Sequence, residues 1–290
     1  YPELLLNLGV AHGVLGHPNA AAAYFRECIA VNSRGAALAK KNLGQILLSQ
    51  GAFAEGWTHY AARFEADKIQ PRYTGHLEWD GTPQPQGQLI VAAEQGLGDE
   101  ILYLSMLRDL ERAYQGRIVW EMDARLIPLV EGAERYNPRS AVRFIPRSIA
   151  HIERFEGATH RIDAGNIGKH LRTRFSDFGP LDRPPYITAS QFSLKFGKTV
   201  GVSWMSVNTD KGINKTIPIA EWEPLLSALD ARGTNIVSLQ YGAAANDKRV
   251  SEPHFDATYD LEALAAQIRA LAGAAPVRLG LILGSGLGHL

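Results

Sequence analysis

The first 68 residues repeat at a fixed offset. Leu8-Gly9 recurs as Leu43-Gly44, an offset of 35 residues. The same residue types then follow each of these glycines at the same distances: a glycine at +7, a small residue at +12 and an aromatic residue at +16. Small residues let two antiparallel helices approach closely, the aromatic fills the groove beside them, and the glycine turns the chain between them. The six residues concerned are Gly16, Gly51, Ala21, Gly56, Phe25 and Tyr60. The repeat predicts stacked antiparallel helix pairs over residues 1–68.

The pattern changes after the repeats. Residues 69–87 are rich in Pro, Gly and polar side chains, which predicts a linker. Beyond it, short apolar runs at 89–93, 117–122 and 142–146 alternate with helical patterns at 101–114 and 124–131. This alternation predicts a parallel sheet covered by helices over residues 88–190.

Residues 191–290 begin a second α/β segment. Strands are expected at 199–204, 236–240 and 279–283, and helices at 220–232, stopped by Gly233, and at 261–271. The predicted fold class is therefore α/β: helical repeats, a Rossmann-like parallel-sheet domain, and a second Rossmann-like domain that is incomplete at residue 290. A partial sheet exposes an edge, so we expect weak activity or none from this chain alone.

The composition indicates which classes of binding partner and which cellular compartment to expect. Basic and acidic residues number 30 each, which gives no electrostatic reason to expect nucleic acid or an anionic membrane as partner. No apolar run approaches the ~20 residues that span a bilayer, and we expect no signal peptide. The single cysteine, Cys28, allows no internal disulfide and fits a reducing cytoplasm. We expect a cytoplasmic protein with Cys28 in a helical core.

Two loops follow predicted strands, where ligands bind to parallel sheets. The first holds Gly96, Gly98, Asp99 and Glu100. Its glycines allow close backbone approach, and a carboxylate there could act as a general base, Asp99 or Glu100. The alternative is that these acids only cap the following helix, as acids in a first turn often do.

The second loop is polar and carries two lysines. Ser206, Asn208, Lys215 and Thr216 could hold a diphosphate, because lysine supplies charge and the neutral side chains supply donors. The alternative is a solvated loop without a ligand. No P-loop or G-x-S-x-G elbow occurs. The nine histidines lack paired ligand spacing, so we expect no metal site.

Several short sequence segments, spread over roughly the first 270 residues, together resemble one protein family. They are Glu55-Gly56-Trp57, Arg63-Phe64-Glu65, Trp79-Asp80-Gly81, Glu94 to Glu100, Pro185-Tyr186-Ile187, Gly201 to Trp204 with Ser206 and Asn208, Lys215 with Ile217-Pro218, and Val237 to Gly242. Together they resemble bacterial proteins that join tetratricopeptide repeats to a heptosyltransferase-like glycosyltransferase module. Two positions depart from that pattern: Met205 stands where a basic residue is frequent, and Ala243 where an acid is frequent.

The resemblance implies a two-domain glycosyltransferase of the GT-B type. Such an enzyme binds a nucleotide sugar between its domains and inverts the anomeric carbon without a metal or a further cofactor. Asp99 then matches the acceptor-side base, and Lys215 matches the lysine that meets the donor phosphates. The implied partners are a nucleotide sugar and a protein or glycan acceptor, with a further protein partner possible on the repeats.

Residues 271–290 depart from that family. The string from Ala274 to Leu290, with Gly284-Ser285-Gly286, resembles the opening strand and phosphate loop of purine nucleoside phosphorylases. A fusion or assembly chimera joined near Leu271 explains it. The alternative is a degraded donor loop in which Gly284 replaces the acid.

Two functions from different classes follow. The first is a glycosyltransferase that transfers a sugar from a nucleotide sugar to an unknown acceptor. The second is a protein-binding tetratricopeptide module with a non-catalytic α/β remnant. A phosphorylase derived from the tail alone is disfavoured, because the chain lacks a whole nucleoside-binding domain.

Overall fold

The computed structural model describes residues 2–31, 34–132, 142–148, 150–179, 199–203 and 217–238. The chain divides into two compact units. One comprises residues 1–124, 137–184 and 283–290, and the other comprises residues 125–136 and 185–282.

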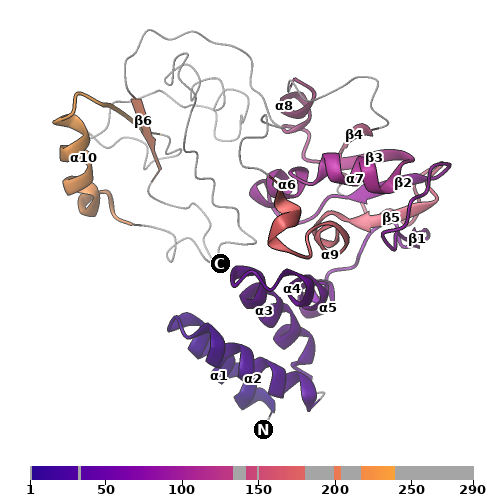
Figure 1. The fold of residues 1–290 in the computed structure, drawn as a ribbon, viewed down its shortest axis with the longest axis horizontal. Helices are drawn as coiled ribbons and strands as arrows, with labels where there is room; N and C mark the ends of the chain where they lie inside the picture. Colours follow the sequence, from indigo (N-terminus) through magenta and orange to yellow (C-terminus); the bar gives the residue numbers. More distant parts are fainter. Residues whose placement is uncertain are drawn as a thin grey trace. The chain divides into compact units, whose positions relative to one another are not determined.

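The first unit opens with helices in antiparallel pairs (Figure 1). They are α1 (Pro2–Val14), α2 (Pro18–Ala30), α3 (Ala36–Ser49), α4 (Phe53–Tyr60) and the short α5 (Arg63–Ala66). The α1–α2 and α3–α4 pairs each turn at the repeat glycine, where Gly16 has φ +73° and Gly51 has φ +78°. This left-handed backbone favours glycine, so the sequence repeat and the helix pairs coincide.

The remaining repeat positions bring the helices of each pair together. A Cβ added to Gly9 would lie 2.4 Å from the Phe25 ring, and one added to Gly44 would lie 2.5 Å from the backbone N of Tyr60. Phe25 and Tyr60 are both 2% exposed. Cys28 is fully buried among alanines and leucines of α2 and α3, which confirms that it is a core residue.

The segment predicted as a linker also contributes to the α/β layer. It contains the two-residue strand β1 (Leu77–Glu78), and it buries Tyr73 and Trp79 to 1% exposure. The Trp79 Nε1–H donates to the carbonyl oxygen of Thr82 at 2.7 Å. Two large aromatics bury more apolar surface than a solvated linker would, and they fix the segment to the sheet.

The sheet has five strands in the order β1-β5-β2-β3-β4, and every neighbouring pair is parallel. The other strands are β2 (Gln88–Ala92), β3 (Arg117–Met122), β4 (Val142–Pro146) and β5 (His160–Asp163). The expected parallel α/β arrangement is thus confirmed, and β3 and β4 have the expected bounds. The sequence did not indicate β5 or β1. The helix expected at 101–114 is two helices, α6 (Leu97–Leu104) and α7 (Leu107–Tyr114).

The two faces of the sheet differ in chemistry. The pairing puts Val91, Trp120 and Ile162 on one face, which is apolar. Side chains on the other face include Ile90 and Val119 but also the charged residues of β5. That second face packs against Tyr73, Ile152, Phe155 and Ala158, which belong to irregular chain rather than to a helix. Charged groups therefore lie beneath loops, where backbone N–H groups can bind them.

After β5 the first unit has three short helical elements, η1 (Ala164–Asn166), α9 (Gly168–Leu171) and η2 (Phe175–Phe178). The second unit contains α8 (Ile127–Glu131), β6 (Thr199–Val202), η4 (Ile219–Trp222), α10 (Glu223–Asp230) and β7 (Asn235–Ser238). β6 and β7 pair in parallel, with Val202 and Leu226 buried between strand and helix. Gly233 at φ +63° follows α10, as expected for a helix stop. The helix expected at 261–271 and the strand expected at 279–283 lie outside the described residues.

No described helix combines the length and apolar character needed to cross a membrane.

Gly44→Ala tests the close packing of the second helix pair. The new methyl group would meet backbone atoms of Tyr60, which cannot rotate away, so we expect the free energy of unfolding in urea to fall by ~1–3 kcal/mol. The matched control is Gly13→Ala. A Cβ at Gly13 meets nothing within 4 Å, so helix propensity should raise stability by up to ~1 kcal/mol. Equal effects of the two substitutions would contradict the close contact.

Candidate functional site

The carboxyl ends of the strands form the natural binding edge of this sheet. From β2 the chain proceeds outward to β3 and β4, then returns to place β5 on the other side of β2. The order therefore reverses between β2 and β5, and in open α/β sheets a crevice for ligands opens at such a switch point. Glu94 follows β2, and Asp163 ends β5.

In this protein Arg63 of α5 occupies that position. Its Nε donates to Glu94 Oε2 at 2.6 Å and its Nη2 to Glu94 Oε1 at 2.5 Å. Its Nη1 donates to Asn166 Oδ1 at 2.8 Å, and the N–H of Gly165 donates to Glu94 Oε1 at 2.6 Å. Arg63 is 4% exposed and Glu94 7%. Burial alone would lower the pKa of Arg63, but the Glu94 carboxylate outweighs it and raises that pKa.

The switch point is therefore filled by protein. A Cβ at Gly165 would lie 2.8 Å from Glu94 Oε1 and 3.0 Å from Arg63 Nη2. A second contact holds the helix pairs beside α9: Trp57 Nε1 donates to the carbonyl of Arg172 at 2.9 Å, and the Trp57 ring packs on Gly168. The helix pairs dock directly on the α/β layer, which leaves the regions on either side of the docking point as the candidate ligand sites at this edge.

On one side lies the glycine loop predicted as a site. Gln95 has φ +61° and Gly96 is the N-cap of α6. Asp99 is 1% exposed, and its Oδ2 accepts the N–H of Gly96 at 3.2 Å. This is the geometry of a helix cap, the alternative considered for these acids. Gly98 lies in the first turn of the same helix.

Glu100 has different surroundings. Its Oε2 accepts the backbone N–H of Asp123, just beyond β3, at 2.7 Å. Its Oε1 lies 3.5 Å from Arg147 Nη1, and Arg147 also donates to the carbonyl of Gln95 at 3.0 Å. Glu100 is 3% exposed, and burial raises its pKa to about 7. The side chain of Arg147 is 39% exposed, so in this pair Arg147, and not Glu100, is the charged group accessible to solvent.

Glu121 holds the loops around this site. Its carboxylate forms an ion pair with Arg72 and accepts hydrogen bonds from the Tyr73 hydroxyl at 3.1 Å, Ala93 N–H at 3.1 Å and Ser148 N–H at 3.0 Å. These donors come from three separate segments. The carboxylate therefore ties the ends of β2 and β4 to the segment before β1.

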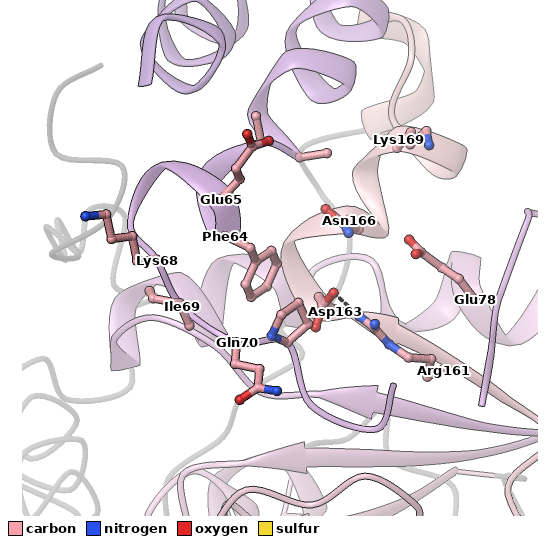
Figure 2. Close-up of a pocket in the computed structure, with 13 residues that line it drawn as sticks. Phe64, Glu65, Lys68, Ile69, Gln70, Glu78, Arg161, Asp163, Asn166 and Lys169 are labelled. Carbon is pink, nitrogen blue, oxygen red and sulfur yellow. Dashed lines mark hydrogen bonds and ion pairs between the residues drawn. The ribbon is translucent and has the colours of Figure 1, made fainter. Parts of the chain in front are cut away.

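On the other side of the docking point lies an open cleft of about 750 Å³ (Figure 2). Arg161 and Asp163 of β5 form an ion pair at its base, and burial raises the pKa of Asp163 to about 6 despite that pair. The rest of the lining comes from α5 and the chain on either side of it, and from β1, η1 and α9: Ala61, Ala62, Phe64, Glu65, Lys68, Ile69, Gln70, Pro71, Glu78, Asn166 and Lys169.

The structure brings together only part of the predicted site. Gly96, Gly98, Asp99 and Glu100 share one loop and helix start, whereas the predicted phosphate-binding residues lie outside the described residues: Ser206, Asn208, Lys215 and Thr216. Within the described ranges, no group of three metal-ligating side chains occurs.

Sequence reasoning missed Arg147, Glu121 and the Arg161–Asp163 pair. Glu121 did leave a signal, as a carboxylate inside the otherwise apolar end of Arg117 to Met122, where an unpaired charge would be costly. Arg147 directly follows β4, which places it at the carboxyl edge of the sheet.

Comparisons with known proteins give one distant relative. Over 216 residues the chain is 29% identical to Protein FlbA of Caulobacter vibrioides, a match that covers 68% of this chain and 36% of that protein. The chain thus spans little more than a third of this relative. No family model matches, and no solved structure matches.

Arg63→Ala tests the docking interaction. It would leave the Glu94 carboxylate buried without its partner, so we expect a loss of ~3–5 kcal/mol in the free energy of unfolding measured in urea. The control is Arg26→Ala, which removes an exposed pair with Glu55 and should cost under ~1 kcal/mol. If the two substitutions cost the same, the buried pair does not hold the helices on the sheet.

Glu100 should make stability depend on pH. Its folded pKa of about 7 lies above the ordinary 4.5, so the folded chain binds this proton more tightly than the unfolded chain. The resulting stabilisation is complete below pH 4.5 and is lost as pH rises through 7. Asp163 also lowers the stability as pH rises, between pH 3.8 and about pH 6. We therefore expect Glu100→Gln to flatten the fall in unfolding free energy between pH 6 and 7.

The control is Glu27→Gln, at an exposed position on α2. It should leave the pH dependence of the original chain unchanged. If the unfolding free energy of the Glu100→Gln variant still falls between pH 6 and 7, another group is responsible for that fall.

Proposed function

We propose that this protein is a glycosyltransferase-like enzyme that transfers a sugar from a nucleotide-sugar donor to an acceptor hydroxyl. The observation that carries the proposal is Glu100: a carboxylate of raised pKa beside a glycine loop at the carboxyl end of β2. A group that titrates near neutral pH can take a proton from a hydroxyl during transfer. The sequence resemblance supports the same class of reaction.

The roles divide between neighbouring groups. Glu100 is the proposed general base, and Asp99 is assigned to the helix cap, because its carboxylate accepts the Gly96 N–H. Arg147, which is more exposed, binds an anionic group of the acceptor or donor. When Arg147 turns toward that anionic group, it leaves Glu100 Oε1. This oxygen can then accept a hydrogen bond from the acceptor hydroxyl.

The donor side of the proposal rests on the second unit. β6 and β7 are parallel, and the polar loop with Ser206, Asn208, Lys215 and Thr216 follows β6 in the sequence. Lysine and hydroxyl groups after a parallel strand suit a diphosphate. We propose that Lys215 contacts the donor phosphates and that the reaction needs no metal.

The chain should bind a nucleoside diphosphate and release one from a nucleotide sugar. In a titration with a panel of nucleoside diphosphates, a ligand at about 100 times its dissociation constant adds ~2.7 kcal/mol of stability, visible as a rise in Tm. Lys215→Ala should abolish that rise. We expect only weak release of nucleoside diphosphate from the matching nucleotide sugar by this chain alone. Glu100→Gln should keep the rise in Tm but lower that weak release by ~100-fold or more.

Two substitutions serve as controls. Lys40→Ala, on α3, should leave the nucleotide-induced rise in Tm intact. Asp99→Asn should cost ~1 kcal/mol of stability through the weakened cap and reduce turnover less than Glu100→Gln does. If no nucleotide stabilises the folded chain, or if Asp99→Asn is the more damaging substitution, the proposed roles are wrong.

A second function, binding of a protein by the helix pairs, is favoured by the surface of α1. Leu4, Val10 and Val14 of this helix are 54%, 43% and 84% exposed. Exposed apolar side chains on one helix suit a partner protein. A chain that binds no nucleotide, but loses a partner on substitution of Leu4 and Val14 by Ser, would support this function instead.

A further inference from the structure

The cleft beside β5 has two walls of different chemistry (Figure 2). Phe64, Ile69 and Pro71 supply apolar surface from α5 and the chain after it. The Arg63 guanidinium lies 4.5 Å from the centre of the Phe64 ring, which fixes how that ring is presented. The opposite wall is polar and comes from β1, β5, η1 and α9.

The polar wall offers both donors and acceptors. Asn166 uses its Oδ1 for Arg63, so its amide N–H groups remain as donors. Asp163 uses its Oδ2 for Arg161, so its Oδ1 remains as an acceptor. In the described part of the chain, Glu78 and Lys169 make no side-chain hydrogen bond or ion pair; Figure 2 shows both beside Asn166.

The charges around the cleft balance. The lining contains three cations, Lys68, Arg161 and Lys169, and three carboxylates, Glu65, Glu78 and Asp163. A phosphate or polyphosphate would meet as many carboxylates as cations, so the cleft has no net attraction for an anion. A hydroxyl group is both donor and acceptor, and neighbouring hydroxyls on a ring satisfy interleaved carboxylates and amides without adding charge.

We infer that this cleft binds a neutral carbohydrate, with one sugar ring against Phe64 and its hydroxyls on Glu78, Asp163 and Asn166. The size is suitable, because about 750 Å³ falls within the ~300–1,000 Å³ of ordinary ligand sites. The site lies at β5 and β1, separated from Glu100 by the Arg63–Glu94 docking point. Binding here stands independently of the proposed sugar transfer.

The test is calorimetric titration of the full chain, without nucleotide, with three neutral probes: maltotriose, cellotriose and triacetylchitotriose. We expect at least one probe to bind. Glu78→Ala removes an exposed acceptor that has no partner among the described residues, and Phe64→Leu removes the flat ring while keeping apolar volume. Each should weaken binding of that probe at least tenfold.

The control is Glu27→Ala, on the exposed surface of α2, which should bind as the original chain does. Circular dichroism establishes that every variant is folded; because Glu78 is exposed, its variant keeps the test valid even if Phe64→Leu is unstable. The inference is overturned if no probe binds at millimolar concentration, if Glu78→Ala binds undiminished, or if inorganic phosphate competes for the cleft. The titration contains no nucleotide, so a failure of carbohydrate binding would not contradict the proposed sugar transfer. A failure of the sugar transfer would likewise not contradict this binding site.

Discussion

The buried ion pair between Arg63 and Glu94 is the interaction on which the first unit depends. The helix pairs and the sheet have separate cores, and this pair, with Gly165 and Asn166, joins them through buried hydrogen bonds, while the Trp57 ring adds an apolar contact with Gly168. A charge buried here without its partner would be costly, so the two parts are stable together only when α5 is docked. The repeats are thus built into the α/β unit and complete its carboxyl edge.

Docking also decides where ligands can bind. An open sheet with this strand order would offer its crevice between β2 and β5, yet that space is closed by Arg63 and Gly165. Two regions remain on either side of it, the glycine loop with Glu100 and Arg147, and the cleft above Asp163. Each keeps a buried acid next to an accessible polar surface. A fold-level comparison alone would have placed the ligand at the closed position.

The parts of this fold that follow a local pattern could be predicted, and the parts set by pairing between distant charges could not. Gly16 and Gly51 marked the turns because only glycine adopts their backbone easily, and β3 was evident as an apolar run. β5 has the sequence His-Arg-Ile-Asp, which resembles a loop until Arg161 and Asp163 are seen to pair on one face. β1 is two residues long and is held by Trp79, so no periodicity could indicate it. The acids of the glycine loop were identified from the sequence. The contacts that distinguish Glu100 from Asp99 could not be, because they come from Asp123 and Arg147, which are distant in sequence.

Apart from Asp99, which caps α6, the buried carboxylates of the first unit fall into two groups by how many donors they receive. Glu121 receives four donors, from Arg72, Tyr73, Ala93 and Ser148. Glu94 accepts hydrogen bonds from Nε and Nη2 of Arg63 and from the N–H of Gly165. A carboxylate with its oxygens fully satisfied is fixed and has no lone pair left for chemistry. Glu100 and Asp163 receive fewer donors, and burial raises the pKa of both toward neutrality. Burial of these two acids destabilises the fold, but it also leaves them able to exchange a proton or to accept a ligand hydroxyl. We therefore propose that Glu100 and Asp163, rather than the better-bonded Glu94 and Glu121, belong to the functional surfaces.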